Sequence, residues 1–236
     1  MTWSIVARDP ETGAFGVAVA TKFFAVGSIC PHGRSGAGAL STQALVNPLY
    51  GAKGLRLLAD GVPAADVVRL MTSADEGRET RQVHVVDSAG RNAAHTGRDC
   101  VDWAGHVIGE SVSVAGNMLA GPQVVQETLK AYQANMDQPL AERLIRGLEA
   151  GDAAGGDKRG RQSACLLIYD GEEYPRLDLR VDDHTLPLPE LRRLWGVAQT
   201  HYLPFKSCLP KKGDPVGIYD RAKILDVVAK AQAALS

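Results

Sequence analysis

The start of the chain alternates apolar residues with small or polar ones, a period of two that is typical of β-strands. In residues 3–7, the side chains of Trp3, Ile5 and Ala7 fall on one face of the predicted strand. A second apolar run covers residues 15–20, and the Asp-Pro-Glu-Thr-Gly stretch between the two runs has the composition of a turn. These features predict a β-hairpin.

Further extended segments are expected after this hairpin. Residues 23–29 are expected to continue in an extended conformation, and residues 33–43, rich in Gly, Ala and Ser, predict a tightly packed buried strand with its loops. Other apolar or alternating runs predict strands at residues 81–87, 91–95, 111–115, 163–169 and 176–181.

Apolar residues spaced three or four apart predict helices around residues 55–59, 67–71, 122–136, 139–150, 191–198 and 224–228. Pro63 stands where the first turn of a helix tolerates proline, and Gly151 is placed to cap the helix that precedes it. Residues 203–214, rich in Pro, Lys and Gly, are interpreted as a linker.

This order of elements predicts an α+β fold, in which antiparallel sheets built from hairpins are covered by pairs of helices. A doubly wound nucleotide-binding fold is disfavoured, because no GxGxxG motif opens a helix after the first strand. Residues 1–200 are assigned to one domain, and residues 201–236 to a linker and a C-terminal helix.

Composition narrows the classes of function. A formal net charge of -1 over 236 residues argues against broad attraction to nucleic acid or to an anionic membrane. No apolar run is long enough to span a bilayer, and charged residues interrupt any N-terminal signal segment, so a cytoplasmic protein is expected. The 4 cysteines and 6 histidines are scattered, which predicts free thiols and neither a metal site nor a cofactor.

The hydroxyl residue that follows the initiator methionine is the first candidate for chemistry. If Met1 is removed, Thr2 carries a nucleophile and a base on one residue. A free α-amine has a pKa of about 8 and can accept the hydroxyl proton. If Met1 stays, the Thr2 nitrogen is an amide and cannot act as a base. The simpler interpretation is that the Met-Thr start is accidental.

Two residues could assist such a nucleophile. Lys22 follows the hairpin partner of the first strand, and a cation there would lower the pKa of a neighbouring amine. Asn117, which with Gly116 ends a small-residue strand, suits an oxyanion hole. Alternatively, Lys22 is a solvated strand-end lysine and the Gly-Asn pair serves a turn.

Substrate-binding candidates lie in two other segments. The loop of residues 155–163 is the densest polar cluster of the chain, and Asp157 and Arg161 within it could hold a charged substrate. Gln43, at the end of the buried Gly/Ala strand, could bind an amide group. A solvated loop is the alternative for the first segment.

Several blocks of sequence together resemble a known family. They are the first strand (residues 2–9), the second strand with Lys22 (16–22), Thr42-Gln43-Ala44-Leu45-Val46-Asn47, Gly116-Asn117-Met118-Leu119-Ala120-Gly121 and the loop 155–163. Over residues 2–185 the chain resembles a mainly bacterial family catalogued as domain of unknown function ten-twenty-eight. The resemblance implies a fold similar to N-terminal-nucleophile (Ntn) hydrolases: a four-layer αββα sandwich, with two antiparallel sheets between helix layers.

Such a fold implies an amide-bond hydrolase acting on a small-molecule or peptide substrate, with Thr2 as nucleophile. The rival hypothesis is a non-catalytic ligand-binding or scaffold protein with the same sandwich. A cysteine- or metal-dependent hydrolase has little support from residue spacing. Homo-oligomerisation is compatible with this architecture.

Overall fold

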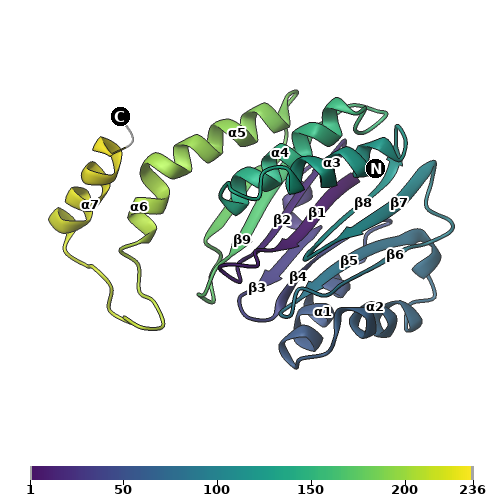
Figure 1. Ribbon diagram of the computed structural model, residues 1–236, viewed down its shortest axis with the longest axis horizontal. Helices are drawn as coiled ribbons and strands as arrows, with labels where there is room; N and C mark the ends of the chain where they lie inside the picture. Colours follow the sequence, from purple (N-terminus) through teal and green to yellow (C-terminus); the bar gives the residue numbers. More distant parts are fainter. Residues whose placement is uncertain (1, 235–236) are drawn as a thin grey trace. The chain divides into compact units, whose positions relative to one another are not determined.

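The computed structural model describes residues 2–234, which form two compact units, one extending to Leu191 and the other beginning at Arg192. The first unit contains two β-sheets and four helices that cover them, α1–α4 (Figure 1). Every pairing between neighbouring strands in these sheets is antiparallel.

The larger sheet has six strands in the order β10-β9-β2-β1-β8-β7. Their bounds are β10 Leu177–Val181, β9 Ser163–Tyr169, β2 Phe15–Thr21, β1 Thr2–Arg8, β8 Val112–Leu119 and β7 Trp103–Gly109. The first strand of the chain is therefore a central strand, flanked by its hairpin partner β2 on one side and by β8 on the other.

The smaller sheet has four strands in the order β3-β4-β5-β6. They span β3 Pro31–Arg34, β4 Gly38–Ala44, β5 Arg81–Asp87 and β6 Asn92–Thr96. The segment predicted as one buried strand with loops is thus the hairpin β3–β4.

Helices cover the outer face of each sheet, as Figure 1 shows. Helices α3 (Gln123–Gln133) and α4 (Leu140–Ala153) pack on the six-stranded sheet, while α1 (Leu49–Ala59) and α2 (Ala64–Ser73) pack on the four-stranded sheet. The predicted αββα sandwich is confirmed.

The pattern of buried side chains explains this layering. Both faces of β4 are buried: Leu40 lies in the cluster beneath α1 and α2, and the adjacent Ala39 lies in the cluster between the two sheets. In β5, Val85 and Val86 divide between the same two clusters. Because successive side chains of a strand point to opposite faces, a strand inside a four-layer sandwich needs continuous rather than alternating hydrophobicity.

Three local predictions are wrong. Residues 23–29 do not extend the second strand, because Ala25 has a positive φ of 51° and the 3-10 helix Val26–Ser28 follows. Gly151 does not cap α4, which continues to Ala153. The segment predicted as a linker from residue 203 begins with a helical turn, α6 (Leu203–Lys206).

The second unit is helical. Helix α5 (Pro187–Val197) crosses the boundary between the units and runs through a π-helical stretch, Ala198–Tyr202, into α6. Helix α7 (Arg221–Ala233) follows, and the Asp220 carboxylate caps it by accepting from the backbone N–H groups of its first turn. Within residues 2–234, none of the helices combines the length and hydrophobicity needed to cross a membrane.

Candidate functional site

The predicted nucleophile, Thr2, is the first residue of β1, which is a central strand of the six-stranded sheet. Thr2 pairs with Thr21 on β2 and with Asn117 on β8, which is within the strand β8 rather than in a turn after it. The Thr2 Oγ1 atom lies 3.1 Å from Thr21 Oγ1, within hydrogen-bond distance, and the residue is 7% exposed. Met1 lies outside the described residues.

Thr2 lines a cavity of about 100 Å³, and we call it the Thr2 cavity. Apolar side chains from the β2–β3 connection and from the end of β4 form most of its wall, together with two polar residues, Gln43 and Arg159. The lining residues are Thr2, Phe23, Val26, Ile29, Cys30, Gln43, Ala44, Val46 and Arg159. Thr2, Gln43 and Arg159 are therefore the polar residues of a small, mainly apolar pocket.

Asp157 organises the loop that brings Arg159 to this cavity. Its carboxylate accepts from the backbone N–H of Lys22 at 2.9 Å and from that of Arg159 at 2.7 Å. The Arg159 guanidinium lies 3.4 Å from the same carboxylate, with its side chain 45% exposed. Asp157 itself is buried, so its negative charge is used to fix the loop against the end of β2.

The two cations of the predicted site, Lys22 and Arg161, do not line this cavity. The Lys22 side chain is exposed, and its Nζ donates to the Arg161 carbonyl oxygen at 3.4 Å. Arg161 pairs through Nε with the Asp152 carboxylate at the C-terminal end of α4. Of the loop's cations, Arg159 rather than Arg161 lines the Thr2 cavity.

A chain of buried amide side chains connects the two sheets behind the cavity. The Gln43 Nε2 donates to Gln82 Oε1 at 2.8 Å, and Asn117 Nδ2 donates to the same oxygen at 3.1 Å. Gln82 Nε2 in turn donates to the carbonyl oxygens of Gly105 and Gly116. Asn117 Nδ2 also reaches the Thr2 carbonyl oxygen at 3.5 Å, so the position of Thr2 is linked to the sandwich interior.

A second buried chain runs through His84. Its Nε2 lies 2.7 Å from Ser4 Oγ and its Nδ1 lies 3.0 Å from Ser113 Oγ. Burial, with a smaller contribution from the charge of His106, lowers the pKa of His84 to about 3. His84 is therefore neutral near pH 7 and acts as a hydrogen-bonding link between the sheets.

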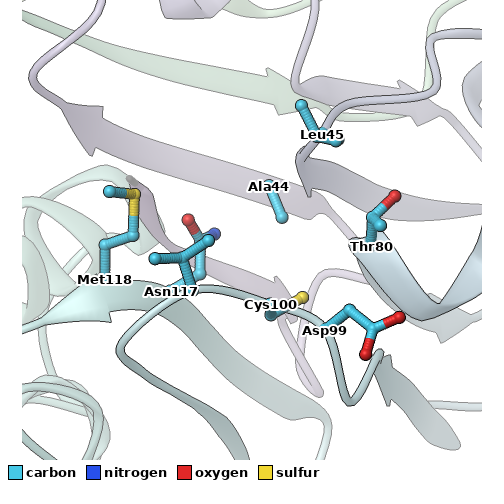
Figure 2. A pocket seen from close by; sticks show the side chains of 8 residues that line it. Ala44, Leu45, Thr80, Asp99, Cys100, Asn117 and Met118 are labelled. Carbon is cyan, nitrogen blue, oxygen red and sulfur yellow. The ribbon is translucent and has the colours of Figure 1, made fainter.

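A second cavity, of about 190 Å³, is lined by Asn117, the register partner of Thr2, and we call it the Asn117 cavity (Figure 2). Its walls come from the end of β4, the 3-10 helix Arg78–Thr80 that precedes β5, the β6–β7 loop and β8. The lining residues are Ala44, Leu45, Thr80, Asp99, Cys100, Val101, Asn117 and Met118. Ala44 lines both cavities, so the two adjoin.

Neither cysteine beside these cavities resembles an activated nucleophile. Burial raises the pKa of Cys30 to about 12 and raises the pKa of Cys100, whereas a reactive thiol needs a lowered pKa. All four cysteines are free thiols. Among residues 2–234, no group of three or more His, Cys, Asp and Glu side chains has the arrangement of a metal site.

Sequence reasoning missed several residues of this site. Thr21 could have been found, because the hairpin register places it opposite Thr2. Gln82 and Arg159 gave no distinguishing signal: the first resembles any polar residue at a strand start, and the second is one of several cations in a loop.

Comparison with known proteins places the chain in a family. No curated protein sequence matches it. The crystal structure of protein SPO2555 from Silicibacter pomeroyi is similar, with 34% sequence identity over 93% of this chain and 96% of that chain and a TM-score of 0.86. A distant similarity, with 14% identity over 83% of this chain and 94% of that chain and a TM-score of 0.40, connects the chain to Anbu (ancestral beta-subunit) from Yersinia bercovieri.

The sequence itself matches one family over most of its length. Residues 2–191 match the family described as "Family of unknown function (DUF1028)", and SPO2555 carries the same family designation. This range coincides with the αββα unit and includes both cavities. The chain therefore belongs to the DUF1028 family.

Proposed function

We propose that the protein is an amide-bond hydrolase of the N-terminal-nucleophile type, acting on a small or peptide-like substrate. The observation that carries this proposal is the place of Thr2, which lines a cavity at the end of a central strand and whose Oγ1 lies 3.1 Å from Thr21 Oγ1. Removal of Met1 would place a free α-amine on the same residue. Nucleophile and base would then share one Cα at the cavity wall.

The chemistry proceeds in two steps. The α-amine takes the proton of Thr2 Oγ1, the oxygen attacks the amide carbonyl, and the same proton passes to the leaving amine as the C–N bond breaks. Water then attacks the acyl-threonine ester while the amine takes a proton from it. The same proton passes to Thr2 Oγ1 as the ester C–O bond breaks, which releases the acid and restores the free hydroxyl. Splitting the reaction in this way replaces one difficult displacement by two easier ones.

Two side chains are assigned supporting roles. Asn117 is the proposed oxyanion donor, because its Nδ2 is held beside Thr2, and its 3.5 Å contact with the Thr2 carbonyl is weak enough to be exchanged for a stronger acceptor. Lys22 is the proposed tuning cation, acting at longer range from the end of β2.

The charged part of the substrate is assigned to the loop of residues 155–163. Arg159 would bind a substrate carboxylate, because a guanidinium group has five N–H donors and its contact with Asp157 is long, at 3.4 Å. Asp157 and Arg161 act with it indirectly: the first holds the loop to Lys22 N, and the second ties the loop to α4. Gln43 contributes a polar wall to the same cavity.

A specific observation favours the rival function, a non-catalytic ligand-binding protein. Both N–H groups of Asn117 already have acceptors, Gln82 Oε1 and the Thr2 carbonyl oxygen. A site that only binds a ligand would keep this arrangement and would not need the removal of Met1.

The N-terminus distinguishes the two functions. We expect the protein, expressed with no N-terminal tag, to lack the mass of Met1 and to react with periodate, which cleaves the amino-alcohol of an N-terminal threonine. Retention of Met1 on the newly purified protein would contradict the proposal.

Activity provides the second test, measured with a panel of dipeptides and N-acyl amino acids by release of free amine. Thr2→Ala should abolish release and Thr2→Ser should keep part of it. Thr185→Ala, at an exposed threonine of the same unit, is the control and should be fully active. Full activity of Thr2→Ala would contradict the proposal.

A further inference from the structure

The Asn117 cavity and the Thr2 cavity adjoin along one wall. Ala44 lines both, and Asn117 in one cavity is the register partner of Thr2 in the other. An extended molecule that crosses Ala44 would therefore have one end in each cavity and its middle beside the Thr2–Asn117 pair.

The backbone at this shared wall has an uncommon conformation. Ala44 has φ 69° and Met118 has φ 55°, left-handed values that cost residues other than glycine on the order of 1 kcal/mol or more. Ala44 ends β4, and Met118 N–H donates to the Val101 carbonyl oxygen at 3.1 Å, which brings the β6–β7 loop over the cavity. Both left-handed residues thus line the Asn117 cavity, and Ala44 also lines the Thr2 cavity.

The Asn117 cavity is suited to an apolar group. Half of its lining residues are apolar, namely Ala44, Leu45, Val101 and Met118. Its volume of about 190 Å³ exceeds that of an engineered apolar cavity of about 150 Å³ that takes up benzene. Leu45 and Val101 are 64% and 59% exposed, and Phe23, at the Thr2 cavity, is 57% exposed, so an apolar rim surrounds both openings.

The charges at the two cavities have opposite signs. Arg159 lines the Thr2 cavity, whereas Asp99 lines the Asn117 cavity, where Figure 2 shows its carboxylate directed away from Asn117. Asp99 has a distant ionic partner, Arg98 at 3.9 Å, and its side chain is 59% exposed. An exposed pair at this distance is weak, so the Asp99 carboxylate can exchange it for a ligand cation.

We infer that the two cavities are two subsites for one zwitterionic, apolar ligand of the dipeptide class. Its carboxylate binds Arg159, its free ammonium group binds Asp99, and its apolar side chains fill the cavities. This inference rests on the proposed function, because it places the scissile amide of the ligand beside Thr2. The binding itself does not depend on hydrolysis.

Binding is tested with the Thr2→Ala protein, so that turnover does not interfere. Leucyl-leucine is titrated calorimetrically beside two capped forms, N-acetyl-leucyl-leucine and leucyl-leucinamide. We expect the uncapped dipeptide to bind about tenfold or more tightly than either capped form, because each cap removes one charge-assisted contact.

Variants that remove one charge from the protein show which residue binds each end of the dipeptide. In the Thr2→Ala background, Asp99→Asn should remove the preference for leucyl-leucine over the N-acetyl form, and Arg159→Gln should remove the preference over the amide. Asp137→Asn and Arg69→Gln, both at exposed side chains elsewhere, are the matched controls and should retain both preferences.

Two results would overturn the inference: no binding of leucyl-leucine at millimolar concentration, or equal weakening of all three ligands by Asp99→Asn. Failure of the proposed function gives a different result, namely intact zwitterion binding by a protein that does not cleave amides.

Discussion

Thr2 and Asn117 face each other across the two central strands of the six-stranded sheet, and Asn117 Nδ2 donates to the Thr2 carbonyl oxygen at 3.5 Å. The same amide donates to Gln82 on the opposite sheet. The residue that we propose as nucleophile is thus connected by one side chain to the interior of the sandwich. This relationship allows catalytic and structural roles to be separated by mutation.

Asn117→Leu should lower kcat for amide hydrolysis by about 10²- to 10³-fold, the usual cost of removing one oxyanion donor, while KM changes little. The variant also leaves Gln82 Oε1 with one donor fewer, so its unfolding free energy should fall by about 1 kcal/mol. Steady-state kinetics and urea unfolding measure the two effects separately. An unchanged kcat in folded protein would remove Asn117 from the catalytic assignment.

Gln82→Met should destabilise the sandwich, although Gln82 itself lines neither cavity. The substitution keeps the approximate shape of the side chain but removes a donor from the carbonyl oxygens of half-buried Gly105 and buried Gly116. It also removes the acceptor that Gln43 and Asn117 share, and each buried group left unsatisfied costs about 1–3 kcal/mol. Urea unfolding measures the loss. The matched control is Gln126→Met on the exposed side of α3, which should change stability by less than about 0.5 kcal/mol.

The neutral His84 predicts a loss of stability in mild acid. The unfolded chain takes up a proton near the ordinary histidine pKa of about 6.5, whereas burial lowers the pKa of His84 in the folded protein to about 3. Its contribution is therefore fully present above pH 6.5 and is lost progressively as the pH falls toward 3, by at most about 1.4 kcal/mol per pH unit.

Unfolding free energies between pH 7.5 and pH 5 check this effect. His84→Gln should flatten the slope, and His201→Gln, at an exposed histidine, should leave it unchanged. The His84→Gln protein should keep part of the slope, because burial also lowers the pKa of His32 and of His106. Identical slopes for the His84→Gln and wild-type proteins would refute the assignment.

Two helical glycines should respond oppositely to alanine. A methyl group added at Gly151 would lie 2.2 Å from Thr128 Oγ1 and 2.9 Å from Trp3 Nε1, so Gly151→Ala should cost about 1–3 kcal/mol. The control Gly196→Ala, in α5, meets no atom within 4 Å and should stabilise by up to about 1 kcal/mol. Thermal unfolding of the pair distinguishes close packing from helix propensity.

Sequence periodicity predicted most of the fold because buried strands and amphipathic helices dominate it. The spans 81–87 and 163–169 coincide with β5 and β9. Strand β7 was not predicted, because it is a half-exposed edge strand in which Gly105, His106 and Gly109 dilute the apolar pattern. Gly151 was misread because a glycine needed for close packing looks the same in sequence as one needed for a left-handed cap.

The candidate site was less accessible from sequence. Hairpin register brings Thr2 to Thr21, but its pairing with Asn117 joins residues 115 positions apart and depends on the order of strands in the sheet. The hydrogen bonds of Asp157 fix the conformation of the loop and so decide which of its arginines lines the cavity. The local amino-acid composition does not predict this choice.

Trp3, next to Thr2 in the first strand, has a consequence for experiment. Its indole is fully buried, and atoms added at Gly151 or Gly156 would lie within 2.9 Å and 3.5 Å of it, so helix α4 and the start of the loop that carries Arg159 both border it. The chain has 3 tryptophans, and replacing Trp103 and Trp195 by phenylalanine would leave this one alone. Its fluorescence would then report, in real time and without a label, every change in packing that a ligand causes beside Thr2.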